Sequence, residues 1–269
     1  MLGAQKAGTT TLHAALRRAK GVSDGGLKEW HVLDRWLRPA ETEDVGRIMA
    51  QAARAAKRPA VREAHAARAE ALRRPEAMLE HFARVAPEAR VFLDVSPDYA
   101  LLRGEDWLVA REFYDAAGLR VRPVFLMRDP AQRLFSYARA LAEAHGLQPG
   151  AALRAALEDE GAMLRSRYET TLAALWSVFP REEVTVAFHE TLWTRPKALR
   201  RLAARLGVRL RAQEVRPRNV TRGAPAAEPR LAEAEARLAP TYEFARRWFG
   251  RKVPASWADP APTEPAGRS

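Results

Sequence analysis

Hydrophobic residues along the chain follow two patterns, short continuous runs and longer stretches with helical spacing. Three runs are long enough only for buried strands, at residues 90–95, 121–127 and 184–188. A shorter apolar start at residues 1–4 predicts one more strand, which ends in a glycine-containing turn. That strand is shorter than a central strand usually is, so we expect Met1 to be a late start or the chain to have been trimmed.

Apolar residues spaced three or four apart predict amphipathic helices between these strands. Leu12 and Leu16 share one face of the first helix, at residues 9–19. Pro59 and Pro75 mark helix starts in the alanine-, arginine- and glutamate-rich segment that precedes the second predicted strand. Further helices are predicted at residues 105–117, 131–144, 163–179, 196–206 and 231–248.

Buried strands that alternate with helices indicate an α/β fold with a central parallel sheet of about five strands flanked by helices. The chain shows no internal repeat and no clear linker. We therefore predict a single domain over residues 1–250, followed by a Pro/Ala-rich C-terminal tail over residues 251–269 that is loosely held.

Composition narrows the choice of partners. The formal net charge of +12 predicts attraction to anions without naming them. No basic stripe interleaved with aromatic residues is present, which argues against a nucleic-acid partner. The absence of cysteine excludes disulfides, thiolate metal sites and a cysteine nucleophile. No apolar run is long enough to span a membrane and no signal-peptide pattern is present, so we predict a cytoplasmic protein.

The first strand and the first helix are joined by a loop that contains two glycines, LGAQKAGTTTL. Such a loop can turn its amide hydrogens inward and hold a phosphate at the helix N-terminus, and the hydroxyls of Thr9 and Thr10 add donors. In the ATP-binding loop GxxxxGK[ST], the lysine directly follows the second glycine. Here Thr9 has that position and Lys6 lies inside the loop. We therefore expect Lys6 to lie beside the bridging oxygen of a two-group anhydride.

A second anion site is predicted directly after the apolar run at residues 121–127. Asp129 suits a helix N-cap and Pro130 suits the first helical position. Arg128 then lies at the carboxyl end of a strand, where open α/β sheets bind ligands, and Ser136 follows about two turns along the helix. Two phosphate sites on one sheet fit a nucleotide that is phosphorylated at both ends.

The segments GAQKAGTTTLHAAL and LMRDPAQRLFSYARAL resemble the two nucleotide-binding motifs of sulfotransferases that use 3′-phosphoadenosine 5′-phosphosulfate (PAPS). In that family a GxxKxGTT-type loop holds the 5′-phosphosulfate, and an RdPxxRxxSxY-type segment holds the 3′-phosphate. The resemblance implies a three-layer, P-loop-like fold, PAPS as donor, 3′,5′-adenosine bisphosphate (PAP) as product and no metal. It implies nucleotide binding by Lys6, Ala7, Gly8, Thr9, Thr10, Thr11, Arg128, Ser136, Tyr168, Arg222 and Gly223.

Four further segments resemble the bacterial and glycan-type branches of the same family. KEWHVLD at residues 28–34 is similar to KExHFFD, although Trp30, Val32 and Leu33 depart from its usual small or aromatic residues. DVSPDY is similar to xxSPxY, and SRY with the later FP to an SxY…FP stretch. NVTRG, which contains Arg222, loosely resembles the late loop that closes over the nucleotide. The resemblance thus extends over residues 2–248.

Sulfuryl transfer requires an aligned acceptor, stabilisation of the leaving phosphate and removal of the acceptor's proton. By resemblance, Lys6 stabilises or protonates the leaving oxygen, Lys28 helps to bind the sulfuryl group and Glu29 is the general base. From the residues alone, His31 is a second candidate for the base. Its ordinary pKa is close to neutral pH, and it points to the same side of an extended segment as Glu29. The choice between Glu29 and His31 stays open here.

Two other functions compete with sulfuryl transfer. Asp94 follows an apolar strand, as the magnesium-linked acid of a P-loop kinase does, but the lysine that such a kinase needs after its second glycine is missing. The net charge alone would fit a non-enzymatic binder of acidic polymers. The remaining histidines are too scattered for a metal site. A small molecule or a glycan fits as acceptor, and the sequence leaves a homo-oligomer open.

Overall fold

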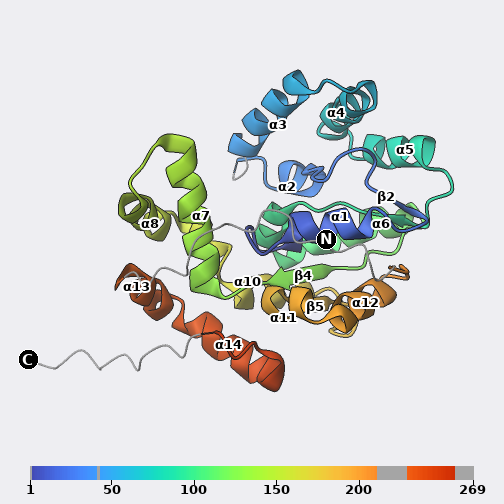
Figure 1. Ribbon diagram of the computed structural model, residues 1–269. Helices are drawn as coiled ribbons and strands as arrows, with labels where there is room; N and C mark the ends of the chain where they lie inside the picture. Colours follow the sequence, from blue (N-terminus) through green and yellow to red (C-terminus); the bar gives the residue numbers. More distant parts are fainter. Residues whose placement is uncertain (1, 41–42, 211–228, 258–269) are drawn as a thin grey trace, which may run out of the picture.

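The strands of this protein form two small parallel sheets (Figure 1). The computed structural model describes residues 2–40, 43–210 and 229–257. Strands β1 (Leu2–Gly3), β4 (Val124–Met127) and β5 (Thr185–Phe188) form one sheet in the order β1-β4-β5. Strands β2 (Val22–Ser23) and β3 (Val91–Phe92) form the other. Parallel neighbours need long crossover connections, which the intervening helices supply.

Strand β4 is the centre of the hydrophobic core. All of its residues are buried, which explains why its sequence VFLM is continuously apolar rather than alternating. It pairs with β1 on one side, where Leu2 is opposite Phe125, and with β5 on the other, where Thr185 is opposite Val124. The carboxyl ends of β1, β4 and β5 therefore meet at one edge of the sheet.

Helices surround the three-stranded sheet. Some of them also form a second hydrophobic cluster, separate from the main core. That cluster includes Leu27 and Trp30 together with residues of α4 and α5 such as Met78 and Phe82, and Figure 1 shows α4 and α5 above α2. The helices before β4 are α1 (Thr9–Leu16), α2 (Val32–Leu37), α3 (Glu43–Ala55), α4 (Pro59–Ala71), α5 (Glu76–Val85), η2 (Pro97–Leu101) and α6 (Gly104–Ala116). Those after β4 are α7 (Pro130–His145), α8 (Pro149–Glu158), α9 (Glu160–Leu164), α10 (Tyr168–Trp176), α11 (His189–Thr194), α12 (Pro196–Arg205), α13 (Pro229–Arg237), α14 (Ala239–Phe249) and η3 (Gly250–Lys252).

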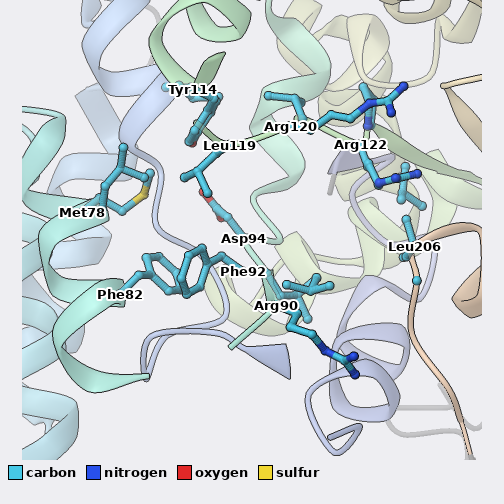
Figure 2. Close-up of a pocket in the computed structure, with 18 of the residues that line it drawn as sticks. Met78, Phe82, Arg90, Phe92, Asp94, Tyr114, Leu119, Arg120, Arg122 and Leu206 are labelled. Carbon is cyan, nitrogen blue, oxygen red and sulfur yellow. The ribbon is translucent and has the colours of Figure 1, made fainter. Parts of the chain in front are cut away.

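The predicted α/β class with parallel strands is confirmed, but the strands divide between two sheets. The predicted strand at 90–95 is reduced to β3, which pairs only with β2, a strand that the hydrophobic pattern did not reveal. A cavity of about 530 Å³ separates β3 from the segment that leads into β4 (Figure 2). Figure 2 shows Phe82 and Phe92 on one side of it and Arg120 and Arg122 on the other.

Two predicted helices are each broken in the structure. The stretch 163–179 contains the end of α9 and all of α10, because the chain turns at residues 165–167. The stretch 231–248 is divided at Leu238 into α13 and α14. Pro240 follows this break and has no N–H to continue the preceding helix. Apolar spacing alone does not reveal such breaks, since both halves keep their buried faces.

The start of the predicted C-terminal tail is not loosely held. Trp257 is buried, and its ring packs against Tyr168, Phe188 and Tyr242 at centroid distances of 6.3, 5.4 and 6.0 Å. Burial of an aromatic side chain of this size holds residues up to 257 on the core. The domain boundary at residue 250 stays a prediction.

Candidate active site

The loop between β1 and α1 is an anion-binding turn built from backbone conformation. Lys6 and Gly8 both adopt left-handed backbone angles, with φ of 69° and 91°. The turn is closed by a hydrogen bond of 3.0 Å from the Ala7 amide to the Ala4 carbonyl. This bond uses the Ala7 N–H inside the loop, so Ala7 can shape the turn but has no free amide for a ligand.

Helix α1 begins directly after this turn, and its first amides are unpaired among the described residues. Gly8 is the N-cap and offers no side-chain acceptor. Within the described residues, the amides of Gly8, Thr9 and Thr10 have no hydrogen-bond acceptor. The first turn of α1 carries no acidic residue. Free amides at a positive helix end form a site for a phosphate-like anion.

Arg128 reaches this loop from the end of β4. Its Nη1 donates a hydrogen bond of 3.1 Å to the main-chain carbonyl of Lys6. The two sequence-predicted anchors, which are 122 positions apart, are therefore neighbours at the carboxyl edge of the sheet. The arginine is half-buried and has further N–H groups for a ligand.

Several buried groups hold Arg128 and the helix that follows it. Tyr168 is completely buried, and its hydroxyl donates a hydrogen bond of 2.6 Å to the Arg128 carbonyl. Asp129 caps α7 by accepting from the Gln132 amide at 3.0 Å. Its own amide donates to Glu190 at 2.9 Å. Tyr168 thus fixes the main chain at Arg128, and Glu190 fixes it at Asp129. The sequence analysis did not predict the role of Glu190.

The charges of several residues act on the side chain of Lys6. Burial lowers its pKa, the charges of Arg128 and Arg133 lower it further, and Glu143 opposes this shift. Glu143 lies seven residues after Ser136, which places both on one face of α7. Ser136 is half-buried and has no hydrogen-bond partner among the described residues. The Lys6 ammonium and the Ser136 hydroxyl have no hydrogen-bond partner among the described residues, so both are available to a ligand.

Helix α11 closes the other side of the loop. The Nδ1 atom of His189 lies 2.8 Å from the Ala7 carbonyl and 3.0 Å from Nε1 of Trp193. A Cβ atom added to Gly8 would lie only 2.8 Å from that Nδ1 atom. Sequence reasoning treated His189 as unremarkable. Its position directly after β5, at the edge where the strands end, was the signal that could have identified it.

A charged network surrounds the second group of predicted catalytic residues. Lys28 and Glu29 form an ion pair in direct contact. His31 bridges two carboxylates, with Nε2 3.2 Å from Glu29 Oε2 and Nδ1 2.8 Å from Asp34 Oδ2. Nδ1 also lies 3.9 Å from Asp98 Oδ2. The structure brings Lys28, Glu29 and His31 together, and the contact of Glu29 with His31 agrees with the prediction from their spacing.

The network fixes the protonation of its members. Burial would lower the pKa of His31, but its hydrogen bonds with Asp34 and Glu29 raise the pKa to about 10. Burial would raise the pKa of Glu29, but the hydrogen bond with His31 and the charge of Lys28 lower it to about 2. At neutral pH, His31 is therefore an imidazolium that donates from both ring nitrogens, and Glu29 is an ionised acceptor.

The network is connected to the anion-binding loop through buried polar contacts. Arg165 Nε donates to Asp98 at 2.7 Å. The next residue, Ser166, accepts from Arg133 Nε at 2.7 Å, and Arg133 is a fully buried residue of α7. Tyr168 follows two residues later and donates to the Arg128 carbonyl. Residues 165–168 therefore contact both the network around His31 and the segment that carries Arg128.

Asp94 is used as a structural acceptor. Its Oδ1 accepts from the Trp30 amide at 3.2 Å and from the Ser96 hydroxyl at 2.6 Å, and its Oδ2 accepts from the Tyr99 hydroxyl. These bonds hold the segment before His31, whose amide donates to Ser96 at 3.0 Å. A carboxylate so engaged does not match the free acid that a magnesium-dependent kinase needs.

The described residues contain one group with the spacing of a metal site, namely His31, Asp34 and Asp98. Both ring nitrogens of His31 already face carboxylates, and its raised pKa keeps the ring protonated. A metal ligand must instead be a neutral imidazole. We therefore interpret the group as an ion-pair network.

Arg222 and Gly223, which the resemblance implies for nucleotide binding, fall outside the described residues. The cavity of Figure 2 is lined by the start of β4 and by β3, and neither the loop residues 3–11 nor Arg128 line it. We therefore do not assign the nucleotide to it, although Asp94 and Tyr99, which help to hold the segment around His31, belong to its lining.

The fold and this site define a parallel α/β protein with an anion-binding loop at the carboxyl edge of its sheet. The chain belongs to the sulfotransferase family, since the family model described as "Sulfotransferase family" matches residues 1–212. Its fold is similar to a sulfotransferase from Alicyclobacillus acidocaldarius, with 20% identity, coverage of 96% of each chain and a TM-score of 0.64. The comparison with curated proteins found no matching sequence. Family membership identifies the protein as an enzyme that transfers sulfuryl groups.

One structural finding bears on the membrane. Every helix in the described ranges is either too short or too polar to cross a bilayer.

Proposed function

We propose that this protein transfers the sulfuryl group of PAPS to a hydroxyl or amine acceptor and releases PAP. The observation that carries the proposal is the contact of Arg128 with the Lys6 carbonyl at 3.1 Å. It brings two anion-binding elements together at one edge of the sheet, within reach of a single nucleotide that carries phosphate groups at both ends. An ATP-like triphosphate would need only the loop.

In this proposal the loop holds the 5′-phosphosulfate. The free amides of Gly8, Thr9 and Thr10 bind its phosphate oxygens, and the Thr11 hydroxyl lies one position further along α1. The Lys6 ammonium neutralises charge on the leaving phosphate as the bond to sulfur breaks. Preorganised donors of this kind stabilise the transition state because they need no reorientation during the reaction.

The 3′-phosphate is assigned to Arg128 and Ser136. Arg128 offers a planar set of donors that suits a phosphate, and the Ser136 hydroxyl lies on α7 with no other partner among the described residues. Tyr168 acts through the Arg128 carbonyl as a positioning residue. Arg222 and Gly223 are proposed to complete the nucleotide site.

Glu29 is the proposed general base. His31 is protonated near neutral pH, so it cannot accept a proton there, but it orients Glu29 through the 3.2 Å contact. The pKa of about 2 makes Glu29 a weak base while Lys28 contacts it. When Lys28 turns to bind the sulfuryl group, Glu29 loses that cation and its pKa rises, which makes it able to take the acceptor's proton.

Calorimetry with PAP, without magnesium, tests the donor assignment. We expect PAP to bind and 5′-AMP, which lacks the 3′-phosphate, to bind about ten- to a hundredfold more weakly. Magnesium-dependent binding of ATP without any binding of PAP would contradict the proposal. A panel of small-molecule and glycan acceptors, incubated with PAPS labelled in the sulfuryl group, then identifies the acceptor class.

A further inference from the structure

A second hollow of the molecule lies along β5, the outer strand of the three-stranded sheet. It has a volume of about 1210 Å³ and is bounded by β5, α11, α12 and residues 251–256. Figure 1 shows β5, α11 and α12 together below β4, on the side away from α4 and α5. Neither Lys6 nor Arg128 lines this hollow, which we call the basic groove.

The basic groove carries a concentrated positive charge. Its exposed cations include Arg195, Lys197, Arg200, Arg201, Arg251 and Lys252. In the part of the chain that the structure describes, none of the six has a carboxylate partner. The acidic residue in the lining is Glu190, which accepts from the Asp129 amide at 2.9 Å.

Helix α12 displays these cations because of its sequence, PKALRRLAAR. Leu199 and Leu202 are buried against the core, which turns Lys197, Arg200 and Arg201 outward. These six positive charges repel one another, and this repulsion destabilises the free protein. A bound polyanion would reduce the repulsion.

The backbone of β5 supplies a second kind of recognition. The Thr185 amide donates to the Pro123 carbonyl at 2.9 Å, so Thr185 directs its backbone groups toward β4. In a parallel strand the next residue directs its own groups to the opposite side. The N–H and C=O of Val186 therefore face the basic groove, and no described residue bonds to them. An unpaired edge of this kind can pair with another strand.

We propose that the basic groove binds an extended acidic peptide segment of a partner protein, which adds a strand to β5. Main-chain hydrogen bonds to Val186 give such a segment its register. Alternate side chains of a strand point to the same face, so carboxylates at every second position would meet the cations of α12 and of residues 251–252. The site is separate from sulfuryl transfer and explains part of the net charge of +12.

A peptide fits these observations better than other polyanions. Single-stranded nucleic acid is bound by aromatic platforms together with cations, and Phe188, the one aromatic residue in the lining, is buried. An acidic glycan would use the cations but has no backbone amides to pair with Val186. The edge strand is thus the feature that distinguishes a peptide from the alternatives.

Fluorescence anisotropy with a labelled peptide of alternating glutamate and valine tests the proposal on the full chain. We expect the double variant Arg200→Glu/Arg201→Glu to weaken binding by about tenfold or more. Val186→Pro removes the outward N–H, a change that edge strands tolerate, and should weaken binding by about three- to tenfold. Val186→Thr keeps the N–H and should bind as the unmodified protein does.

PAP binding measured on the same variants shows that they are folded, because none of these residues lies in the nucleotide site. A peptide with N-methylated valines, tested on the unmodified protein, gives an independent measure and should bind at least about threefold more weakly. The proposal is overturned if the glutamate–valine peptide does not bind. It is also overturned if Val186→Pro and N-methylation both leave binding unchanged, or if heparin or an oligonucleotide displaces the peptide with higher affinity.

Discussion

The guanidinium of Arg128 donates a hydrogen bond of 3.1 Å to the main-chain carbonyl of Lys6. This contact is made between the carboxyl ends of β4 and β1, which are neighbours in the sheet. It uses one N–H of the guanidinium, and an arginine has five. Arg128 can therefore hold the loop in its binding conformation and contact a phosphate group at the same time.

Arg128→Ala should weaken PAP binding by about ten- to a hundredfold, since it removes a charge-assisted contact to the 3′-phosphate. The affinity for 5′-AMP should change much less. Calorimetry with both nucleotides measures the difference. Arg54→Ala, which removes an exposed arginine of α3, is the matched control and should leave both affinities unchanged. Equal losses for PAP and 5′-AMP would mean that Arg128 acts only on the loop.

Local sequence signals were sufficient to predict the two anchors. The glycine turn and the Asp129–Pro130 helix start depend on residues that are adjacent in the chain, and both are present in the structure. Their supports were not predictable in the same way. Tyr168 and Glu190 reach the turn after Arg128 from 40 and 61 positions away, and only the packed fold brings them there.

The strands show a similar limit. The apolar runs located β4 and β5, because a fully buried parallel strand is continuously hydrophobic. Pairing was less predictable, since β3 joins the two-residue strand β2, whose residues Val22 and Ser23 give no apolar run. The protonation of His31 could not be predicted from its type either, because it is set by Asp34 and Glu29 in the folded protein.

Comparison of Lys6→Gly with Lys6→Ala distinguishes the role of the Lys6 side chain from the cost of its backbone conformation. Its φ of 69° costs a residue with a Cβ atom about 1 kcal/mol relative to glycine. We therefore expect Lys6→Gly to be about 1 kcal/mol more stable than Lys6→Ala in denaturant unfolding. Both variants lose the ammonium, so turnover should fall by about a hundred- to a thousandfold in each. Full activity of either variant would remove Lys6 from the chemical step.

The pH dependence of stability tests the network around His31. Its folded-state pKa is raised to about 10, so its contribution is complete below the ordinary value of 6.5 and is lost as the pH rises through 10. His31→Asn, which keeps a residue that tolerates the φ of 53°, should therefore be destabilised most at about pH 6 and least at about pH 10. Urea unfolding at both pH values measures this, and a constant difference would show that His31 is neutral.

Glu29→Gln probes the base directly. Loss of a general base lowers kcat by about a hundred- to ten-thousandfold. His31→Asn should lower kcat less, because Glu29 keeps its proton-accepting oxygen while it loses an orienting partner. PAP affinity should stay unchanged in both, since neither residue contacts the nucleotide loop. A larger loss in His31→Asn than in Glu29→Gln would reverse the two assignments.

Tyr168→Phe removes the hydroxyl that holds the Arg128 carbonyl at 2.6 Å. The unfolding free energy should fall by about 1 kcal/mol, and PAP affinity should fall several-fold because Arg128 is less well positioned. Tyr137→Phe removes a hydroxyl that donates to Asp159, the N-cap of α9, at 3.0 Å, and it is the matched control. It should show a comparable loss of stability without the loss of PAP affinity.

Gly8→Ala tests whether the loop can accept any side chain beneath α11. The new Cβ would lie 2.8 Å from His189 Nδ1, and the φ of 91° is unfavourable for alanine. Gly118→Ala is the matched control, because Gly118 has a φ of 71° but no atom within 4 Å of the added Cβ. Gly118→Ala should cost about 1–2 kcal/mol from the backbone alone. Gly8→Ala should cost more and abolish PAP binding, since relief of the clash moves the loop. The double variant Gly8→Ala/His189→Ala removes the closest contact and should recover part of the binding. An unchanged loss would attribute the effect to φ and to the remaining contact of 3.2 Å with Trp193 Nε1.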